Sequence, residues 1–157
     1  MPISTFVPYP CYNPYANIPI NIGLNYTIRR NCPPQTVEEL VIMPNEPDTA
    51  ILEISQIFIN MPKTSLLNMF SLEIKYVDTQ GSESYLVAKR WWTDTTSNYT
   101  ILISEIDDPT YAPNEKIITG TPLIARRLIF RILVNILPDT EYTFNIYLKG
   151  RQVRKIV

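Results

Sequence analysis

The amino-acid sequence predicts an all-β protein, an antiparallel β-sandwich preceded by an extended N-terminal arm. Two observations carry this prediction. Apolar and polar residues alternate along much of the chain, which is the period of a strand with one buried face. Prolines concentrate towards the N-terminus, where ten of the 14 fall within residues 1–62, and proline is incompatible with a helix interior.

Length and composition exclude several classes of protein. The 157 residues suffice for one domain with its own core, because a chain of this size buries roughly 70% of its unfolded surface. The net charge of −1 argues against a general nucleic-acid binder. No apolar run approaches the ~18 residues of a membrane span, and the N-terminus lacks the features of a signal peptide. We therefore expect a protein made in the cytoplasm that binds neither nucleic acid nor membrane.

Residues suited to catalysis or metal binding are scarce. The chain has no histidine, which removes the commonest general base and the commonest metal ligand together. Its two cysteines, Cys11 and Cys32, cannot build a zinc site, and either form a disulfide or remain buried free thiols. No nucleophile-elbow or phosphate-binding glycine motif is present. We predict no catalytic, cofactor-binding or metal-binding residues and no enzyme activity; an unrecognised carboxylate pair is the rival hypothesis.

We interpret residues 1–47 as an extended arm that carries an edge strand. Each proline removes an amide donor and pushes the residue before it towards extended geometry. The arm carries aromatic side chains, in which disordered linkers are usually poor: Phe6, Tyr9, Tyr12 and Tyr15. We expect it to become ordered against its own domain or a neighbour; the alternative is a flexible tail. Residues 18–30 carry apolar residues at every second position from 18 to 28 and predict the edge strand, and residues 36–42 form a shorter piece.

Residues 48–157 are predicted to form the sandwich, with an inserted loop region at 91–121. Its strands are expected at residues 49–59, 70–78, 83–90, 99–106, 123–137, 141–149 and 151–157. Residues 70–78 and 83–90 form a hairpin whose loop contains Gly81, available for positive φ. In the first strand we expect Phe58 on the same buried face as Ile54. A turn at Lys149-Gly150 is expected to begin the last strand.

Arginines make residues 123–137 ambiguous, because they could also face outward from a helix. Alternation and a dominance of branched side chains favour a strand.

Residues 136–142, Ile-Leu-Pro-Asp-Thr-Glu-Tyr, have the sequence form of a tyrosine corner, in which a Tyr at a strand start hydrogen-bonds to the chain a few residues upstream. The residues that define it are Ile136, Pro138, Thr140 and Tyr142. The motif resembles the L-x-P-x-T-x-Y corner of fibronectin type III domains, with Ile136 in the Leu position. The resemblance spans roughly residues 48–157 and implies an Ig-like Greek-key sandwich. The integrin-binding tripeptide of that family is absent, so no recognition role transfers.

Two groups of residues are candidates for binding a partner. Trp91 and Trp92 are adjacent, so in a strand one should be buried and the other exposed. The exposed Trp could anchor a sugar ring or a protein, or it could cover the end of the sandwich. Residues 123–157 carry a net charge of +5, against −6 for the rest. This basic segment, which includes Arg151 and Arg154, faces either a neighbouring subunit or acidic residues of its own sheet.

The functional hypothesis is a non-enzymatic structural protein of a virus or phage particle: a capsid-associated, decoration or connector subunit. Extended arms that lie across neighbouring subunits are common in such proteins, and this link is an analogy. The protein would be made in the host cytoplasm, reside in the virion, and bind copies of itself and other subunits through its arm. The alternative is a carbohydrate- or receptor-binding module that uses Trp91, Trp92 and the loop 107–115.

Overall fold

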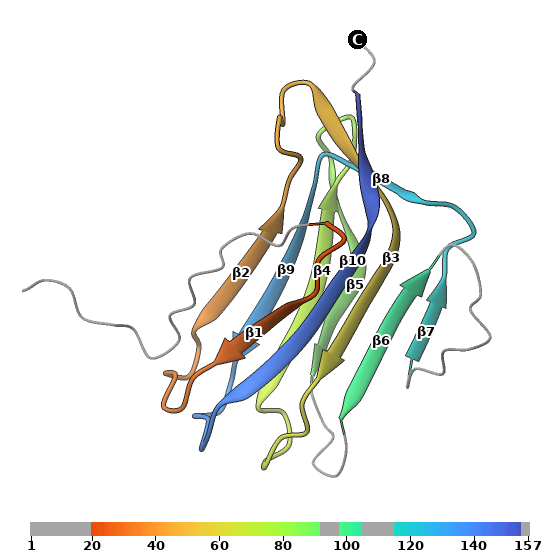
Figure 1. Ribbon diagram of the computed structural model, residues 1–157. Helices are drawn as coiled ribbons and strands as arrows, with labels where there is room; N and C mark the ends of the chain where they lie inside the picture. Colours follow the sequence, from red (N-terminus) through yellow and green to blue (C-terminus); the bar gives the residue numbers. More distant parts are fainter. Residues whose placement is uncertain (1–19, 92–97, 105–114, 155–157) are drawn as a thin grey trace, which may run out of the picture.

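The computed structural model describes residues 20–91, 98–104 and 115–154, and these residues form strands and no helix. The strands are β1 (Leu24–Ile28), β2 (Val37–Ile42), β3 (Ala50–Met61), β4 (Phe70–Val77), β5 (Glu83–Trp91), β6 (Tyr99–Ser104), β7 (Glu115–Ile118), β8 (Leu123–Ala125), β9 (Arg127–Val134) and β10 (Tyr142–Arg154). They build two facing sheets (Figure 1), so the predicted all-β sandwich is confirmed. No helix in the described part of the chain could cross a membrane.

The strand order is nested. The larger sheet has the order β1-β10-β3-β6-β7, and β8 also pairs with β3; the smaller sheet has the order β2-β9-β4-β5. Four antiparallel pairs follow one inside the other along the chain: β1 with β10, β2 with β9, β3 with β6, and β4 with β5. Successive pairs lie in alternate sheets, so the chain winds inwards to the β4–β5 hairpin and back out.

This order differs from the one that the resemblance to fibronectin type III domains implied. In an Ig constant-type sandwich the first two strands of the chain share a sheet. Here β1 and β2 lie in different sheets. The pair β6 and β7 is also parallel, in a sandwich whose other strand pairs are all antiparallel within the described residues.

Part of the region that the sequence assigns to the arm belongs to the sandwich. β1 is an edge strand of the larger sheet, as predicted, and β2 is an edge strand of the smaller sheet. Their inward side chains are fully or nearly fully buried: Leu24, Tyr26, Ile28, Leu40 and Ile42. Cys32, between the two strands, is buried and disulfide-bonded, and Cys11 lies outside the described residues. Residues 20–42 are therefore structural parts of their own domain.

The predicted alternation places the core correctly in most strands. Phe70, Leu72 and Ile74 of β4 are buried, as are the inward residues of β9 and β10. The hairpin loop between β4 and β5 closes as expected, with Gly81 at φ +87°. The ambiguous residues 123–137 are strands, β8 and β9, interrupted at Arg126 where the chain passes from the larger to the smaller sheet.

A β-bulge in β3 reverses its alternation. The pairing of β3 with β10 shifts at Lys149/Gly150, which leaves Ser55 without a partner in the ladder. Leu52 and Ile54 point inward before this residue, and the buried positions after it are Ile57 and Ile59. The expectation that Phe58 shares the buried face of Ile54 was therefore wrong, because the extra residue moves Phe58 to the outer face, where it is half-buried.

The predicted turn at Lys149-Gly150 was also wrong. β10 continues without a break from Tyr142 to Arg154. Gly150 serves close packing instead: a Cβ at this position would lie 2.4 Å from the Glu53 carbonyl oxygen of β3. A glycine inside a strand often marks such a close approach of two backbones.

Candidate interaction surfaces

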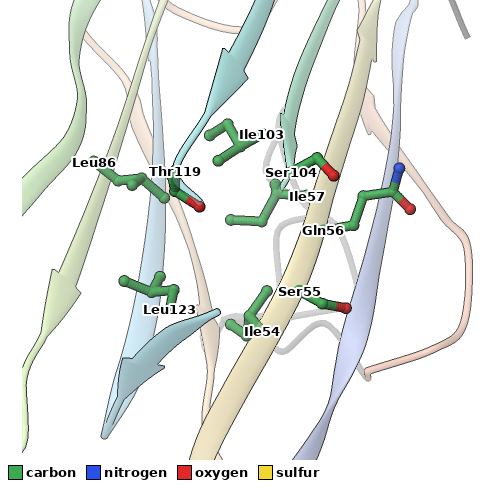
Figure 2. A pocket seen from close by; sticks show the side chains of 9 residues that line it. All are labelled: Ile54, Ser55, Gln56, Ile57, Leu86, Ile103, Ser104, Thr119 and Leu123. Carbon is green, nitrogen blue, oxygen red and sulfur yellow. The ribbon is translucent and has the colours of Figure 1, made fainter. Parts of the chain in front are cut away.

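The hollow that described residues line between the two sheets is too small for a substrate. A small hollow lies between the sheets, where Ile54, Leu86 and Leu123 point towards one another (Figure 2). Its volume of about 10 Å³ is room for one water at most. Small-molecule sites usually measure roughly 300–1,000 Å³. No three metal-ligating side chains cluster among the described residues.

Tyr142 closes a hydrogen-bonded corner at the start of β10. Its ring is buried and packs edge-on against Phe70, with the ring centroids 5.4 Å apart. Its hydroxyl donates to Asp139 Oδ1 at 2.5 Å, three residues upstream. The Tyr142 hydroxyl oxygen also accepts from the Ser65 amide at 3.3 Å and lies 3.2 Å from the Ser65 hydroxyl. Tyr142 thus joins the β9–β10 loop to the β3–β4 loop.

The corner hydrogen bond shifts the pKa of both partners in opposite directions. Burial raises the pKa of Tyr142, and the bond to Asp139 raises it further. The same bond holds the pKa of Asp139 below its usual value. The pair is therefore in its bonded protonation state, with a neutral Tyr and an ionised Asp, throughout the neutral pH range.

The two loops joined by the corner expose a group of leucines that we call the apolar end: Leu66, Leu67 and Leu137. Their side chains are 53%, 57% and 48% exposed. The loops are tied together further, because the Asn135 amide donates to the Met69 carbonyl at 2.8 Å. Both loops lie at the lower end of the sandwich in Figure 1. Exposed large apolar side chains on loops that are tied together in this way suit a protein-binding surface.

Charges of both signs surround the apolar end. The β1–β2 loop joins it through the Asn31 amide, which donates to the Pro138 carbonyl at 3.2 Å. This loop exposes Arg29 and Arg30, and the β9–β10 loop exposes Glu141. An apolar centre with cations and anions at its rim can complement a second copy of itself.

The outer face of the smaller sheet carries a row of ionic contacts. Arg131 of β9 bridges Glu39 of β2 and Glu73 of β4, with Nε 2.9 Å from Glu39 Oε2 and Nη1 3.1 Å from Glu73 Oε1. Glu73 is only 8% exposed, so Arg131 neutralises a nearly buried carboxylate. These contacts hold three neighbouring strands in register.

Trp91 and Tyr85 are exposed aromatic residues of β5. Trp91 is the last residue of the strand and is 42% exposed, and the Lys89 ammonium lies 4.9 Å from its ring centroid. Tyr85 is 58% exposed and holds the Lys75 ammonium at 5.0 Å. Trp91 therefore fits the predicted exposed member of the Trp pair, and Trp92 lies outside the described residues.

The basic C-terminal strands partly face acidic residues of their own sheets. Arg151 Nε lies 2.9 Å from Glu53 Oε1 of the adjacent β3. Together with the Arg131 contacts, this geometry favours the second of the two interpretations of the basic segment. Arg154, at the end of β10, is exposed.

Several candidate residues lie outside the described part of the chain. They are the arm aromatics Phe6, Tyr9, Tyr12 and Tyr15, together with Trp92 and residues 107–114 of the proposed binding loop.

The two sheets are linked at one edge by a partly buried pair that sequence reasoning missed. The Tyr26 hydroxyl of β1 donates to Glu38 Oε2 of β2 at 2.9 Å. Burial raises the pKa of Tyr26, and the nearby Glu38 carboxylate raises it further. Burial also raises the pKa of Glu38. The apolar end was missed as well, although Leu66-Leu67 between two predicted strands was a visible signal.

The chain matches no protein-family model, and no curated protein or solved structure is detectably similar to it.

Proposed function

We propose that this protein is a non-enzymatic structural subunit of a virus or phage particle, with a jelly-roll fold. The observation that carries the proposal is the nested strand order, in which β1–β10, β2–β9, β3–β6 and β4–β5 pair in alternate sheets. Eight strands in two such sheets are the jelly-roll arrangement, which viral capsid domains share with lectins and cupins. Fold alone does not decide among these functions.

The site chemistry supports a structural role over a cupin-like one. Cupin-type sites need a hollow interior, whereas the hollow lined by Ile54, Leu86 and Leu123 between these sheets holds one water at most. The chain also has no histidine to ligate a metal. The apolar end and the arm are the features that suit contact with neighbouring subunits.

The apolar end suits association of copies. Its leucines lie on loops fixed by the Tyr142 corner, so little order has to be gained on binding. Residues 1–19, the part of the predicted arm that precedes the sandwich, provide the second contact with a neighbouring subunit.

Sedimentation velocity and electron microscopy of the full chain test the proposal. We expect discrete oligomers or particles whose fraction grows with concentration. The double variant Leu67→Asp/Leu137→Asp should dissociate them without lowering the free energy of unfolding, since both side chains are exposed. Met43→Asp is the matched control, because Met43 is 43% exposed and lies outside the apolar end. A wild-type chain that stays monomeric at every concentration would overturn the proposal.

A carbohydrate- or receptor-binding module is the second candidate function, and exposed Trp91 is the observation that favours it. Aromatic rings at exposed positions stack on the apolar faces of sugars. Glycan binding that is lost in Trp91→Ala and kept in Tyr85→Ala, by a monomeric protein, would support this candidate in place of the first.

A further inference from the structure

We infer that the outer edge of β10, at residues 150–154, is a strand-addition site for the N-terminal segment of a second copy of this chain, residues 3–7. The inference deepens the proposed assembly function and rests on it, because it names where the arm of one subunit binds the next. It is carried by the way in which β10 extends beyond its neighbour β1.

β10 is the longest strand, and β1 covers only its first part. The ladder between them ends at Leu24 and Ile146. Asn21 then adds three contacts beyond the ladder: its amide donates to the Leu148 carbonyl at 2.6 Å, its Nδ2 donates to the Gly150 carbonyl at 2.9 Å, and the Gly150 amide donates to its Oδ1 at 3.1 Å. The Asn21 side chain therefore takes the place of a neighbouring peptide group and marks the end of the covered edge.

These contacts fix the orientation of the backbone that follows. The N–H and C=O of Gly150 both point away from β3, towards the side on which β1 lies. In an antiparallel ladder this orientation alternates with every residue. The register of β10 with β3 is regular from Gly150 to Arg154, so the N–H and C=O groups of Gln152 and Arg154 point the same way as those of Gly150. No group of the described chain pairs with these four backbone groups.

An unpaired strand edge of this kind is a template for another extended segment. Gln152 and Arg154 are exposed, and no proline or bulge interrupts residues 150–154. The β5 edge of the smaller sheet is different, because its pairing with β4 is broken by irregularities at Leu72/Ile74 and Ile74/Lys75. Such irregularities protect an edge from strand addition. Along residues 151–154 the edge of β10 has no such irregularity, and the contact of the β2–β3 loop there, from the Asn45 amide to Gln152 Oε1 at 2.8 Å, leaves the backbone groups of Gln152 unpaired.

The arm contains a segment that fits this edge. Ile-Ser-Thr-Phe-Val at residues 3–7 is the longest run without proline in residues 1–19, and it has no charge that would be repelled or attracted by Arg151 and Arg154. It is rich in β-branched residues, which favour strands. Pro2 and Pro8 bound it, so it would add five residues opposite a five-residue edge.

The position of the arm favours a second copy as the acceptor. Residues preceding β1 would lie along residues 151–154 of β10 if the extended conformation of β1 continued towards the N-terminus. Asn21 has φ +65°, so the extended conformation ends there. Cys32 is disulfide-bonded and Cys11 is the other cysteine of the sequence, so residues 3–7 depart from the β1–β2 loop with residues 8–10 as their spacer. Three extended residues span about 10 Å. The chain's own residues 150–154 begin eight residues along β10 from Tyr142, which pairs with Ile28 beside this loop, so they are out of reach and the edge of an adjacent subunit is the acceptor.

A complementation experiment with full-length chains tests the inference. The acceptor variant Gln152→Pro/Arg154→Pro removes the two outward N–H donors and leaves the ladder to β3 intact. Its matched control, Gln152→Ala/Arg154→Ala, loses the same side chains and keeps both donors. The donor variant Ser4→Pro/Thr5→Pro removes amides of both orientations from residues 3–7. If the acceptor variant does not fold, as judged by urea denaturation, Arg154→Pro alone replaces it.

Light scattering after size-exclusion chromatography should show that the acceptor and donor variants each associate about tenfold more weakly, or worse, than wild type and the Ala control. An equimolar mixture of the two variants should form dimers, because one contributes a free edge and the other a competent arm. If wild type associates and both Pro variants associate equally well, this site is wrong while the assembly proposal stands. If wild type associates and the two Pro variants lose stability without losing association, the arm binds its own chain and this inference is wrong. If wild type is monomeric throughout, both proposals fail.

Discussion

Because β10 approaches β3 closely at Gly150, we expect the single methyl group added by Gly150→Ala to destabilise the fold. A Cβ added at Gly150 would lie 2.4 Å from the Glu53 carbonyl oxygen and 3.0 Å from Ile54 Cα. Both neighbours are backbone atoms of a central strand, so no side-chain rotation relieves the clash. The two strands would have to separate at the bulge, where the Ser55 hydroxyl also donates to the Lys149 carbonyl at 3.2 Å.

The magnitude follows from two opposing effects. Overpacking of this kind costs about 1–3 kcal/mol. Replacing glycine with alanine also restricts the unfolded chain, which stabilises the fold by about 0.4–1 kcal/mol where the site tolerates a side chain. Because the clashing atoms are backbone, the upper end of the overpacking range applies, about 3 kcal/mol, and after subtraction of the glycine effect we expect Gly150→Ala to lower the free energy of unfolding by about 2 kcal/mol. For a chain of this length that corresponds to a fall in Tm of roughly 4–8 °C.

Urea denaturation followed by circular dichroism measures the effect, with Gly23→Ala as the control. Gly23 lies just before β1, and nothing comes within 4 Å of a Cβ there. The control should be as stable as wild type or slightly more stable. Equal stability of the two alanine variants would refute the argument that Gly150 is required by the approach of β10 to β3.

Three further predictions concern the polar contacts. Tyr142→Phe should lower the free energy of unfolding by about 1 kcal/mol at neutral pH and by less in acid. The pKa of Asp139 is lower in the folded protein, so its contribution to stability is present above an ordinary carboxyl pKa and is lost as pH falls through the folded value. A loss of stability that does not change with pH would count against this prediction. Tyr26 has a raised pKa, so stability should fall as pH rises above about 10, and denaturation of Tyr26→Phe should show a shallower fall than wild type. Arg131→Leu should cost about 2 kcal/mol by leaving Glu73 nearly buried and unpaired, and adding Glu73→Leu should restore most of it; no recovery in urea denaturation would contradict this.

Local features of the sandwich could be predicted from the sequence because they depend on neighbouring residues. Alternation along β4 and β9 placed Phe70, Leu72 and Phe130 in the core, since period 2 and burial are linked within a single strand. The segment around Tyr142 was recognised from a motif of seven residues, and the structure places its hydroxyl on Asp139, within the same motif.

Features that depend on distant residues could not be predicted. The bulge at Ser55 comes from the fit of β3 to β10, so nothing near Phe58 signals that the alternation reverses there. Gly150 has the sequence appearance of a turn, and only the approach of the Glu53 carbonyl shows its purpose. The nested order has the same origin, because alternation gives the faces of each strand and not its neighbours.

The nested pairing also constrains how the chain acquires its structure during synthesis. Within the described part of the chain, the only sheet neighbour of β1 is β10, and Thr27 meets Thr143 across 116 residues of sequence. The only neighbour of β2 among these strands is the late strand β9. Both early strands must wait, unpaired, until nearly the whole polypeptide has left the ribosome, and contacts so remote in sequence make folding slow. Chains that end prematurely would expose these strands together and would be prone to aggregate.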